Sequence, residues 1–293
     1  MKNLTINALE ELCYIAKTAA IEAGQHIQSQ FDSAYKTHTK KGGDSIASQV
    51  VTEVDMKAQE IILGHLQAGS KKYDLGLLTE ENEDDHSRLT KDYFWCIDPM
   101  DGTLPFTEHR TGYAVSIALI SQSGDPSIGV VYIPDTGDCY TSIMNRGVEL
   151  NDAPFVREGT DTDEFHFYMD KSFLSETYID FVKAKLMAWA VPDSGHHLHY
   201  HANYGGVRNA IGVLSSHLGC YFKFPKKQNG CGSIWDYAAT RLFFEELGLI
   251  VTNAQGDPLH LNNPTTTFMN EQGILYATHQ ELADFIMDLR KQV

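Results

Sequence analysis

The chain has 293 residues, enough for about two domains or subdomains with a substantial apolar core. Its hydrophobic fraction of 42% and charged fraction of 21% are ordinary for a globular protein. No apolar run approaches the roughly 20 residues that span a bilayer, so we expect no membrane association. Lys and Arg number 23 against 39 Asp and Glu, and the net charge of −16 disfavours a partner that is a nucleic acid polymer.

The five cysteines are scattered along the chain and show no C-x-x-C pairing. Such a set favours reduced and buried thiols over a disulfide framework. The N-terminus lacks the basic region and the apolar run of a secretion signal, and we therefore expect a cytoplasmic protein.

The N-terminal segment predicts a long helix followed by a loop. Residues from about 5 to 31 place apolar side chains at the spacing of one helical face. Paired glycines break this pattern in the stretch 36–48, where we expect either a mobile loop that carries Lys40 and Lys41 or a solvated basic turn. Asp55 then lies near the start of a second helix, where aspartate is a common cap.

A short apolar run over residues 75–78 predicts a strand that ends at an acidic cluster. Most such clusters are solvated loops, so composition does not select Glu80 over its neighbour Glu81. Glu80 is nevertheless an acid placed just past a probable strand.

The aromatic and branched run from Tyr93 predicts a buried strand that delivers two aspartates. We expect this strand to stop at Asp98, because the following proline donates no N–H to a β-ladder. Asp98 and Asp101 would share a tight turn, where two carboxylates repel each other unless a cation lies between them. Mg²⁺ takes oxygen ligands of this kind and leaves room for a substrate phosphate. The alternative is an Asp-Pro turn whose second aspartate caps a helix.

The turn continues with Gly102, which permits a close approach of the backbone, and with Thr103, whose hydroxyl is suited to hold a water. Residues 113–143 then contain three apolar segments separated by Gly, Pro and Asp turns, which predict successive antiparallel strands. From residue 151 to 201 the signal is weak and indicates one helix.

Histidines are concentrated between His196 and His201. Imidazole is a frequent Zn²⁺ ligand, which makes this stretch a candidate metal site. It is flanked by Gly and Pro and lacks supporting cysteines, so we interpret it as a surface or subunit-contact loop.

The C-terminal part adds two candidate anion-binding features and one acid. A glycine pair ending in Gly206 opens a helix, and it is either a tight turn or a set of N–H groups presented to an anion. Lys223, Lys226 and Lys227 form a basic spot that suits a second phosphate or a solvated turn. Asp236 lies in the first turn of a helix, where the helix dipole favours a carboxylate.

Four motifs, in order along the chain, resemble those of the inositol monophosphatase superfamily of Mg²⁺-dependent, lithium-sensitive phosphatases. They are Val51–Asp55 (V-T-x-x-D), Leu78–Glu81, Asp98–Thr103 (D-P-(I/L/M)-D-G-T) and Trp235–Ala239 (W-D-x-A-A). The resemblance covers the chain from about residue 5 to its C-terminus.

This resemblance implies a layered α/β (α+β) sandwich like that of fructose-bisphosphatase and inositol monophosphatase. Residues 1–150 would form an α+β half that carries most metal ligands. Residues 151–293 would form an α/β half that carries Asp236 and the elements for substrate specificity.

The resemblance also implies a role for each site residue. Two or three Mg²⁺ ions would be held by Glu80, Asp98, the Met100 carbonyl, Asp101 and Asp236. Thr103, oriented by Asp55 and helped by Glu80, would position the attacking water. The phosphate would be bound by Gly102 and Thr103, and the substrate would also contact Gly206, Lys223 and Asp236. Lys40 or Lys41 would belong to a mobile loop over the site.

The implied activity is that of a Mg²⁺-dependent phosphomonoesterase acting on an inositol or sugar phosphate, in a homodimeric protein. Inositol-specific members carry a Glu seven positions before the W-D aspartate, where this chain has Asn229. Together with the lysines, this departure favours an alternative, a 3′(2′),5′-bisphosphate nucleotidase acting on adenosine 3′,5′-bisphosphate. A more distant alternative is a non-catalytic, metal-binding regulatory protein.

Overall fold

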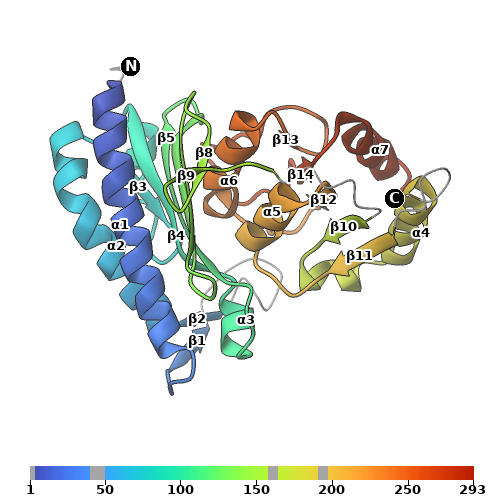
Figure 1. Ribbon diagram of the computed structural model, residues 1–293, viewed down its shortest axis with the longest axis horizontal. Coiled ribbons are helices and arrows are strands. Elements are labelled where there is room, and N and C mark those ends of the chain that lie inside the picture. The colour runs from blue at the N-terminus through green and yellow to red at the C-terminus, as the bar shows by residue number, and fades with distance from the viewer. Residues whose placement is uncertain (1–3, 40–49, 158–163, 191–196) are drawn as a thin grey trace.

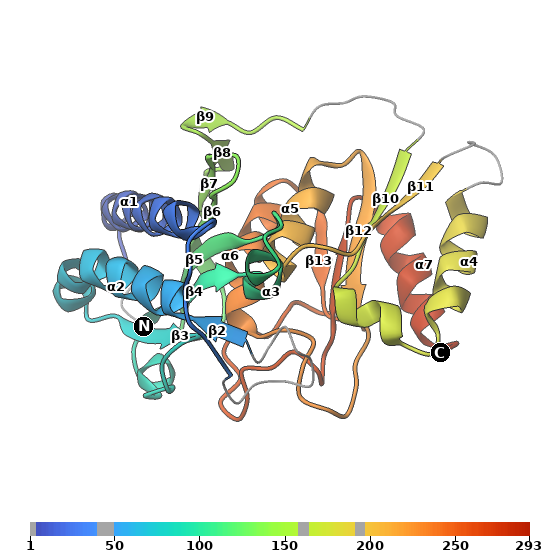
Figure 2. The ribbon, with the colours of Figure 1, turned by 90° about the horizontal axis from the view of Figure 1, so that it is seen from below.

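The computed structural model describes residues 4–39, 50–157, 164–190 and 197–293. Along the long axis of the molecule they form five layers, helix–sheet–helix–sheet–helix (Figures 1 and 2). The structure thus confirms the layered α/β sandwich expected from the sequence.

The first layer consists of the two long helices α1 (Ile6–Gln30) and α2 (Glu53–Tyr73), which cover the outer face of the larger sheet (Figure 2). The apolar stripe of α1 is buried against that sheet, as the helical spacing predicts. Thr52 caps α2 through a reciprocal capping box with Asp55. Asp55 therefore occupies the third helical position rather than the cap.

The larger sheet has seven strands in the order β3-β4-β5-β6-β7-β8-β9. β3 and β4 are parallel, and every later neighbour is antiparallel, which confirms the predicted meander. The strands are β3 (Gly76–Thr79), β4 (Tyr93–Asp101), β5 (Ala114–Ser121), β6 (Pro126–Ile133), β7 (Asp138–Ile143), β8 (Val148–Leu150) and β9 (Ala153–Pro154).

The central layer contains α5 (Gly206–Ser215) and α6 (Ile234–Glu246), which lie between the two sheets (Figure 1). Buried residues of both sheets and of both helices form one continuous apolar core. The ends of these helices can therefore meet strand ends from either sheet, and this is where the cavity described below lies.

The second sheet has the order β11-β10-β12-β14-β13. β10 is parallel to both of its neighbours, and the other pairs are antiparallel. Helices α4 (Ile179–Ala190) and α7 (Gln280–Arg290) cover its outer face (Figure 2). The strands are β10 (Glu164–Tyr168), β11 (His197–His201), β12 (Leu218–Lys223), β13 (Ile250–Thr252) and β14 (Ile274–Ala277).

Three expectations from the sequence are wrong in detail. The strand from Tyr93 does not stop at Asp98 but continues to Asp101. The histidine stretch is not a loop, because His197–His201 is the edge strand β11, while His196 lies outside the described residues. Part of the predicted first loop is the strand β1 (Thr37–Thr39), which pairs with β2 (Val50–Thr52); Lys40 and Lys41 lie outside the described residues.

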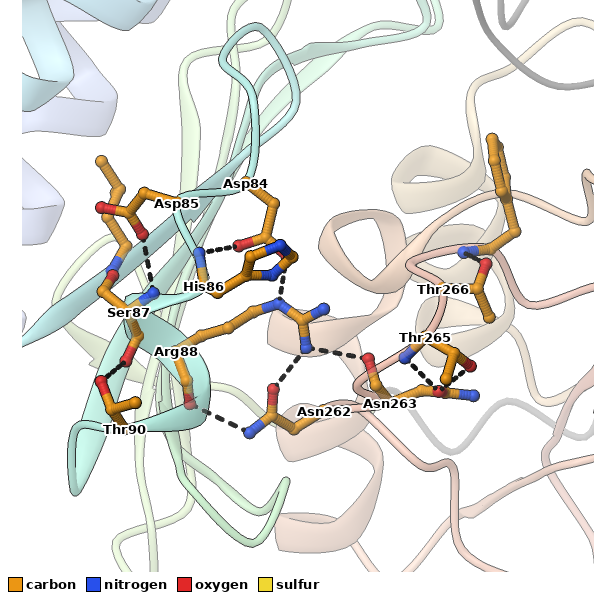
Figure 3. Close-up of polar contacts among 12 residues, drawn as sticks. Asp84, Asp85, His86, Ser87, Arg88, Thr90, Asn262, Asn263, Thr265 and Thr266 are labelled. Atoms are coloured by element: carbon orange, nitrogen blue, oxygen red, sulfur yellow. Dashed lines mark hydrogen bonds and ion pairs between the residues drawn. The ribbon is translucent and has the colours of Figure 1, made fainter.

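A buried arginine joins the loop after β3 to the loop before β14 (Figure 3). Arg88, in the short 3-10 helix η2 (Ser87–Leu89), donates to Asp84 Oδ2 at 2.7 Å and to Asn262 Oδ1 at 2.7 Å. It also donates to the Asn263 carbonyl at 2.9 Å. The same C-terminal loop continues to Phe268, which lines the cavity, so this contact holds that wall against the first half of the chain.

All five cysteines are buried free thiols, which confirms the absence of a disulfide framework. Burial raises the pKa of the Cys96 and Cys220 thiols, which lowers the fraction present as the reactive thiolate. Across the described residues, no helix is both long enough and apolar enough to cross a membrane.

Candidate active site

A cavity of about 350 Å³ lies where the end of β4, the first turns of α5 and α6 and the end of β12 meet. Glu80, Asp98, Asp101 and Asp236 line one side of it. The cavity thus collects residues from both sheets, as is common for ligand sites between structural layers.

A β-bulge brings Asp98 and Asp101 to the same side of β4. Side chains three positions apart in a regular strand point to opposite faces. Opposite these three steps β5 advances by only two, from Ser116 to Ala114, so β4 holds one extra residue. A bulge of this kind re-aims a side chain, and Pro99 is tolerated inside it because that position needs no ladder hydrogen bond.

Asp101 is held by the start of α5. Its carboxylate accepts hydrogen bonds from the N–H of Gly206 at 3.0 Å and of Val207 at 2.8 Å. A Cβ on Gly205 would lie 2.3 Å from Asp101 Oδ2, so only glycine allows this approach. The start of α5 thus presents the N–H groups of Gly206 and Val207 to an anion, and in this structure that anion is Asp101, whereas the Gly205 N–H donates to the Gly112 carbonyl at 2.8 Å.

Asp236 completes a compact acidic cluster from the opposite layer. It lies at the third position of α6, where its Oδ2 accepts the Ser233 N–H at 2.9 Å. Asp98, Asp101 and Asp236 offer carboxylate oxygens that all lie within 4.8 Å of one another. Burial and the neighbouring carboxylates raise the pKa of Asp98 and Asp101, and burial together with Glu80 raises that of Asp236 to about 7.

Glu80 lies beside this cluster but not inside its compact set. Its N–H continues the β3–β4 ladder by donating to the Ile97 carbonyl at 3.1 Å, and its side chain is half-buried in the cavity wall. It is near enough to raise the pKa of both Asp98 and Asp236. Four oxygen-donating acids therefore face one space, which is the donor set that a hard divalent cation prefers.

Thr103 connects the cavity to the buried Asp55. The Thr103 hydroxyl lies 2.9 Å from Asp55 Oδ1 and 3.1 Å from the Met100 carbonyl, and it has one proton to donate between them. Asp55 is 1% exposed, and burial raises its pKa to about 6 although Thr52 and Thr103 donate to it. The carboxylate thus fixes the orientation of the hydroxyl without itself reaching the cavity.

The backbone between these residues is tightly constrained. Gly102 adopts φ of 86°, and a Cβ there would lie 2.6 Å from the Gly112 carbonyl. The Met100 N–H donates to Asp98 Oδ1 at 3.0 Å, which closes a short Asx turn across the bulge. Gly102 and Thr103 then begin the short helix α3 (Thr103–Thr107) at the cavity wall.

The opposite wall of the cavity contains a buried ion pair. Lys223 is 9% exposed at the end of β12 and is paired with Asp170. Asp170 also accepts hydrogen bonds from Tyr221 at 2.8 Å and Asn209 at 3.2 Å. Burial opposes the charge on Lys223, but Asp170 and the nearby Asp236 outweigh it and raise the pKa of the ammonium. This wall therefore offers a hydrogen-bond donor, the Lys223 ammonium, directly beside an acceptor, the Asp170 carboxylate.

A second cationic group lies at the rim. Glu108 bridges Arg110 and Lys171, with 2.9 Å between its Oε1 and the Lys171 Nζ. Arg110 donates to Asn203 at 2.8 Å. Both cations line the cavity.

Of the four residues that indicated substrate specificity in the sequence, Lys223 and Lys226 line the cavity, whereas Asn229 and Lys227 do not. Asn229 is exposed and is not part of the cavity wall, because a loop separates the end of β12 from α6. Counting back seven positions from Asp236 therefore finds a loop residue, and the cavity-facing side chain at the end of β12 is Lys223. Lys226 lines the cavity, whereas Lys227 is exposed outside it.

Sequence reasoning missed Asp170, Arg110 and Lys171. A signal for Asp170 existed, because it comes two residues after the aromatic-rich strand β10, as Asp98 comes three residues after the aromatic run that opens β4. Arg110 and Lys171 come from short turns, and no local pattern brings them together. Aromatic side chains of the same cavity were missed as well: Phe173, Tyr178, Phe224 and Phe268.

Five alternating layers of helices and sheets, with three aspartates gathered between the sheets, make this chain a layered α/β sandwich with a candidate metal site. The chain belongs to the inositol monophosphatase family, whose model matches residues 8–293.

Individual relatives are distant but similar in length. The Nus factor SuhB of Vibrio cholerae is 25% identical over 267 residues, covering 89% of this chain and 91% of that protein. The inositol-1-monophosphatase of Bacillus subtilis is 22% identical over 90% of this chain and 91% of its own length. The crystal structure of the extragenic suppressor protein suhB from Bartonella henselae superimposes with a TM-score of 0.72, 22% identity and 95% coverage of this chain and 98% of that one.

Proposed function

We propose that this protein is a Mg²⁺-dependent phosphomonoesterase that hydrolyses a small polyhydroxylated phosphate, an inositol or sugar phosphate. The observation that carries the proposal is the convergence of Asp98, Asp101 and Asp236 within 4.8 Å, in a cavity that also holds the Thr103–Asp55 pair. Membership of a family of phosphatases supports the reaction class.

The donor set fits Mg²⁺. Each of the acids offers only hard oxygen atoms, and their mutual repulsion favours a divalent cation between them. Two or three ions would be held by Glu80, Asp98, the Met100 carbonyl, Asp101 and Asp236. The Met100 carbonyl keeps one lone pair beyond the one that faces Thr103. When bound, such ions neutralise phosphate charge and lower the pKa of a bound water.

The remaining roles belong to the chain itself. Thr103, held by Asp55, orients the attacking water, and Glu80 accepts its proton or hydrogen bond. The N–H groups of Gly102 and Thr103 at the start of α3 donate to the phosphate oxygens. Gly206 shapes the wall through its bond to Asp101, and Asp236 borders the rest of the substrate.

The Lys223–Asp170 pair supports a polyhydroxylated substrate. Neighbouring hydroxyl groups of a sugar or inositol ring each donate and accept, so they can bond to an ammonium and a carboxylate at once. Lys223 and Asp170 can then bind these hydroxyl groups and remain paired with each other.

The same cavity gives one reason to retain a nucleotidase acting on adenosine 3′,5′-bisphosphate as the second candidate. Aromatic side chains, among them Tyr178 and Phe268, line the cavity and can stack on a base. Arg110 and Lys171 at the rim can receive a second phosphate.

A third candidate is a binding role without turnover, because several relatives are named Nus factor SuhB. In that case the partner would belong to the transcription machinery. The strongly acidic chain would favour contact with a protein component over direct contact with nucleic acid.

The deciding experiment is phosphate release from inositol 1-phosphate, adenosine 3′,5′-bisphosphate and several sugar phosphates, with and without Mg²⁺ and with added lithium. Mg²⁺-dependent, lithium-sensitive release from a polyol phosphate supports the main proposal, and release from the nucleotide alone supports the second. Saturable Mg²⁺ binding without release from any compound supports the binding role. Light scattering of the same preparation tests the homodimer that we propose from the family.

A further inference from the structure

One face of the edge strand β11 and its neighbour β10 concentrates imidazole and carboxylate side chains outside the cavity. The two strands are parallel, with His166 opposite His199 and Tyr168 opposite His201. Because strand side chains alternate, Glu164 and His166 on β10 share their face with His199 and His201 on β11. Figure 2 shows these strands side by side at the border of the second sheet.

The Glu164 carboxylate lies between two imidazoles of this face. One of its oxygens is 3.5 Å from His166 Nε2, and the other is 3.8 Å from His199 Nε2. These separations are long for hydrogen bonds. Zn²⁺ binds nitrogen at about 2.0–2.1 Å, so neighbouring ligand atoms of a tetrahedral ion lie roughly 3.3 Å apart. Glu164 is therefore the common neighbour of both imidazoles without a close hydrogen bond to either, and rotation of its side chain or that of His199 would bring the three donors together.

His201 orients one of the two imidazoles. His166 Nδ1 lies 3.0 Å from His201 Nε2, so one of these nitrogens carries the shared proton. With the proton on His166 Nδ1, its Nε2 lone pair points toward Glu164. This is the arrangement in which a partner fixes the tautomer of a metal-binding histidine. His201 is itself held by stacking on Tyr168, with ring centroids 4.4 Å apart.

The Glu164 and His199 side chains are exposed, so an ion can reach them from solvent and they can rotate to bind it. Glu164 and His199 side chains are 51% and 45% exposed, whereas His166 is 22% exposed. Among the described residues, the compact set of three donors within 4.8 Å is the aspartate cluster, so an ion here requires Glu164 or His199 to rotate.

We propose that Glu164, His166 and His199 form a second metal site, specific for a borderline ion such as Zn²⁺, in which His201 positions His166. Two imidazoles and one carboxylate leave the fourth tetrahedral position to water. Mg²⁺ demands oxygen ligands and does not compete here, while the all-oxygen cluster in the cavity has no nitrogen to favour Zn²⁺. The aspartate cluster in the cavity and the histidine site on β10 and β11 thus differ in metal preference as well as in position.

The test is Zn²⁺ binding by the full chain, free of any histidine tag and measured with a chelator competition in excess Mg²⁺. We expect one Zn²⁺ per chain. Glu164→Gln and His199→Ala should each weaken binding by at least about 100-fold, and His201→Ala by about 10- to 100-fold. Glu164 and His199 are exposed, so their variants should fold normally, which circular dichroism checks. Co²⁺ in place of Zn²⁺ should give the visible absorption of a tetrahedral site in the wild type but not in Glu164→Gln or His199→Ala.

Two controls separate this site from the rest of the molecule. His260→Ala removes an exposed histidine elsewhere in the C-terminal half and should leave Zn²⁺ affinity unchanged. Asp98→Asn should also leave it unchanged. Equal affinity in the wild type, Glu164→Gln and His199→Ala would overturn the proposal, and so would a loss of binding confined to Asp98→Asn, which would place the ion in the cavity. Neither result depends on phosphatase activity.

Discussion

The two walls of the cavity differ in how their charges are balanced. On one wall Asp98, Asp101 and Asp236 face one another, and burial together with neighbouring carboxylates raises their pKa values. On the other wall Lys223 is already paired with Asp170. The three aspartates of the first wall, which we call the acidic wall, carry charges of the same sign that do not balance one another. The Lys223–Asp170 pair of the second wall, which we call the basic wall, has no net charge.

This difference assigns separate tasks to the walls. Unbalanced carboxylates gain most from a cation, so the acidic wall is where metal and phosphate chemistry is expected. A preformed ion pair offers no free charge, and an anion would have to displace its partner. The basic wall is therefore better suited to select the hydroxyl pattern of the substrate than to supply charge for the reaction.

The largest expected effect comes from Asp98→Asn, which removes one charge from the acidic wall. The amide oxygen can still accept the Met100 N–H, so the turn is retained. Loss of metal binding should remove about 4 kcal/mol of transition-state stabilisation, roughly a 10³-fold fall in kcat/KM. Phosphate release and Mg²⁺ titration measure both. Wild-type turnover in this variant would show that the acidic wall is not the reaction centre.

A smaller loss is expected from Thr103→Val, which keeps the shape of the residue and removes the hydroxyl that Asp55 holds. If Thr103 orients the attacking water, kcat should fall by about 10²-fold while Mg²⁺ affinity stays close to that of the wild type. Thr103→Ser restores the hydroxyl and serves as the matched control. A Val variant as active as the Ser variant would remove Thr103 from the mechanism.

Lys223→Met tests the selecting role of the opposite wall. The loss of a charged hydrogen bond of about 1.5–3 kcal/mol should lower kcat/KM for a polyol phosphate by roughly 10- to 100-fold. Activity on a minimal phosphate ester without ring hydroxyls should fall far less. Lys227→Met alters an exposed lysine outside the cavity and is the control. Equal losses on both substrates would mean that Lys223 supports the metal centre instead.

The aspartates of the acidic wall could be predicted from the sequence, because local sequence patterns determine where each of them lies. An aromatic strand, a helix start and a proline turn each carry one acid, and these features occur at fixed positions along the chain. The bulge was not predicted, because a proline inside a β-run is normally a stop signal and only the pairing with β5 shows that the strand continues through Pro99.

Most residues of the basic wall could not be predicted from the sequence, because contacts in the folded chain rather than local patterns bring them together. Lys223 ends β12 and Asp170 lies two residues beyond the neighbouring strand β10, but Arg110 and Lys171 meet only through Glu108 in the folded chain. The β11 strand was missed because histidines do not give the branched pattern of a strand. Its pairing with β10 fixes the register there, which is a tertiary property.

The smallest effect concerns stability without metal. Burial and Glu80 raise the pKa of Asp236 from 3.8 to about 7, so the folded protein binds more protons than the unfolded chain between these pH values. The free energy of unfolding contributed by Asp236 is then greatest at acidic pH and falls as the pH rises through about 7. Burial and the charges of Glu80, Asp101 and Asp236 also raise the pKa of Asp98 itself, and an asparagine there carries no charge. In EDTA, Asp98→Asn should therefore exceed the wild type by about 1–2 kcal/mol near neutral pH and by less near pH 4. Urea denaturation at both pH values measures this difference, in which the opposite contribution of histidines such as His166 cancels.

Saturating Mg²⁺ should make the wild type more stable than Asp98→Asn, because only the wild type keeps the full ligand set. A difference in stability that is independent of pH and of metal would mean that the acidic wall is not under electrostatic strain.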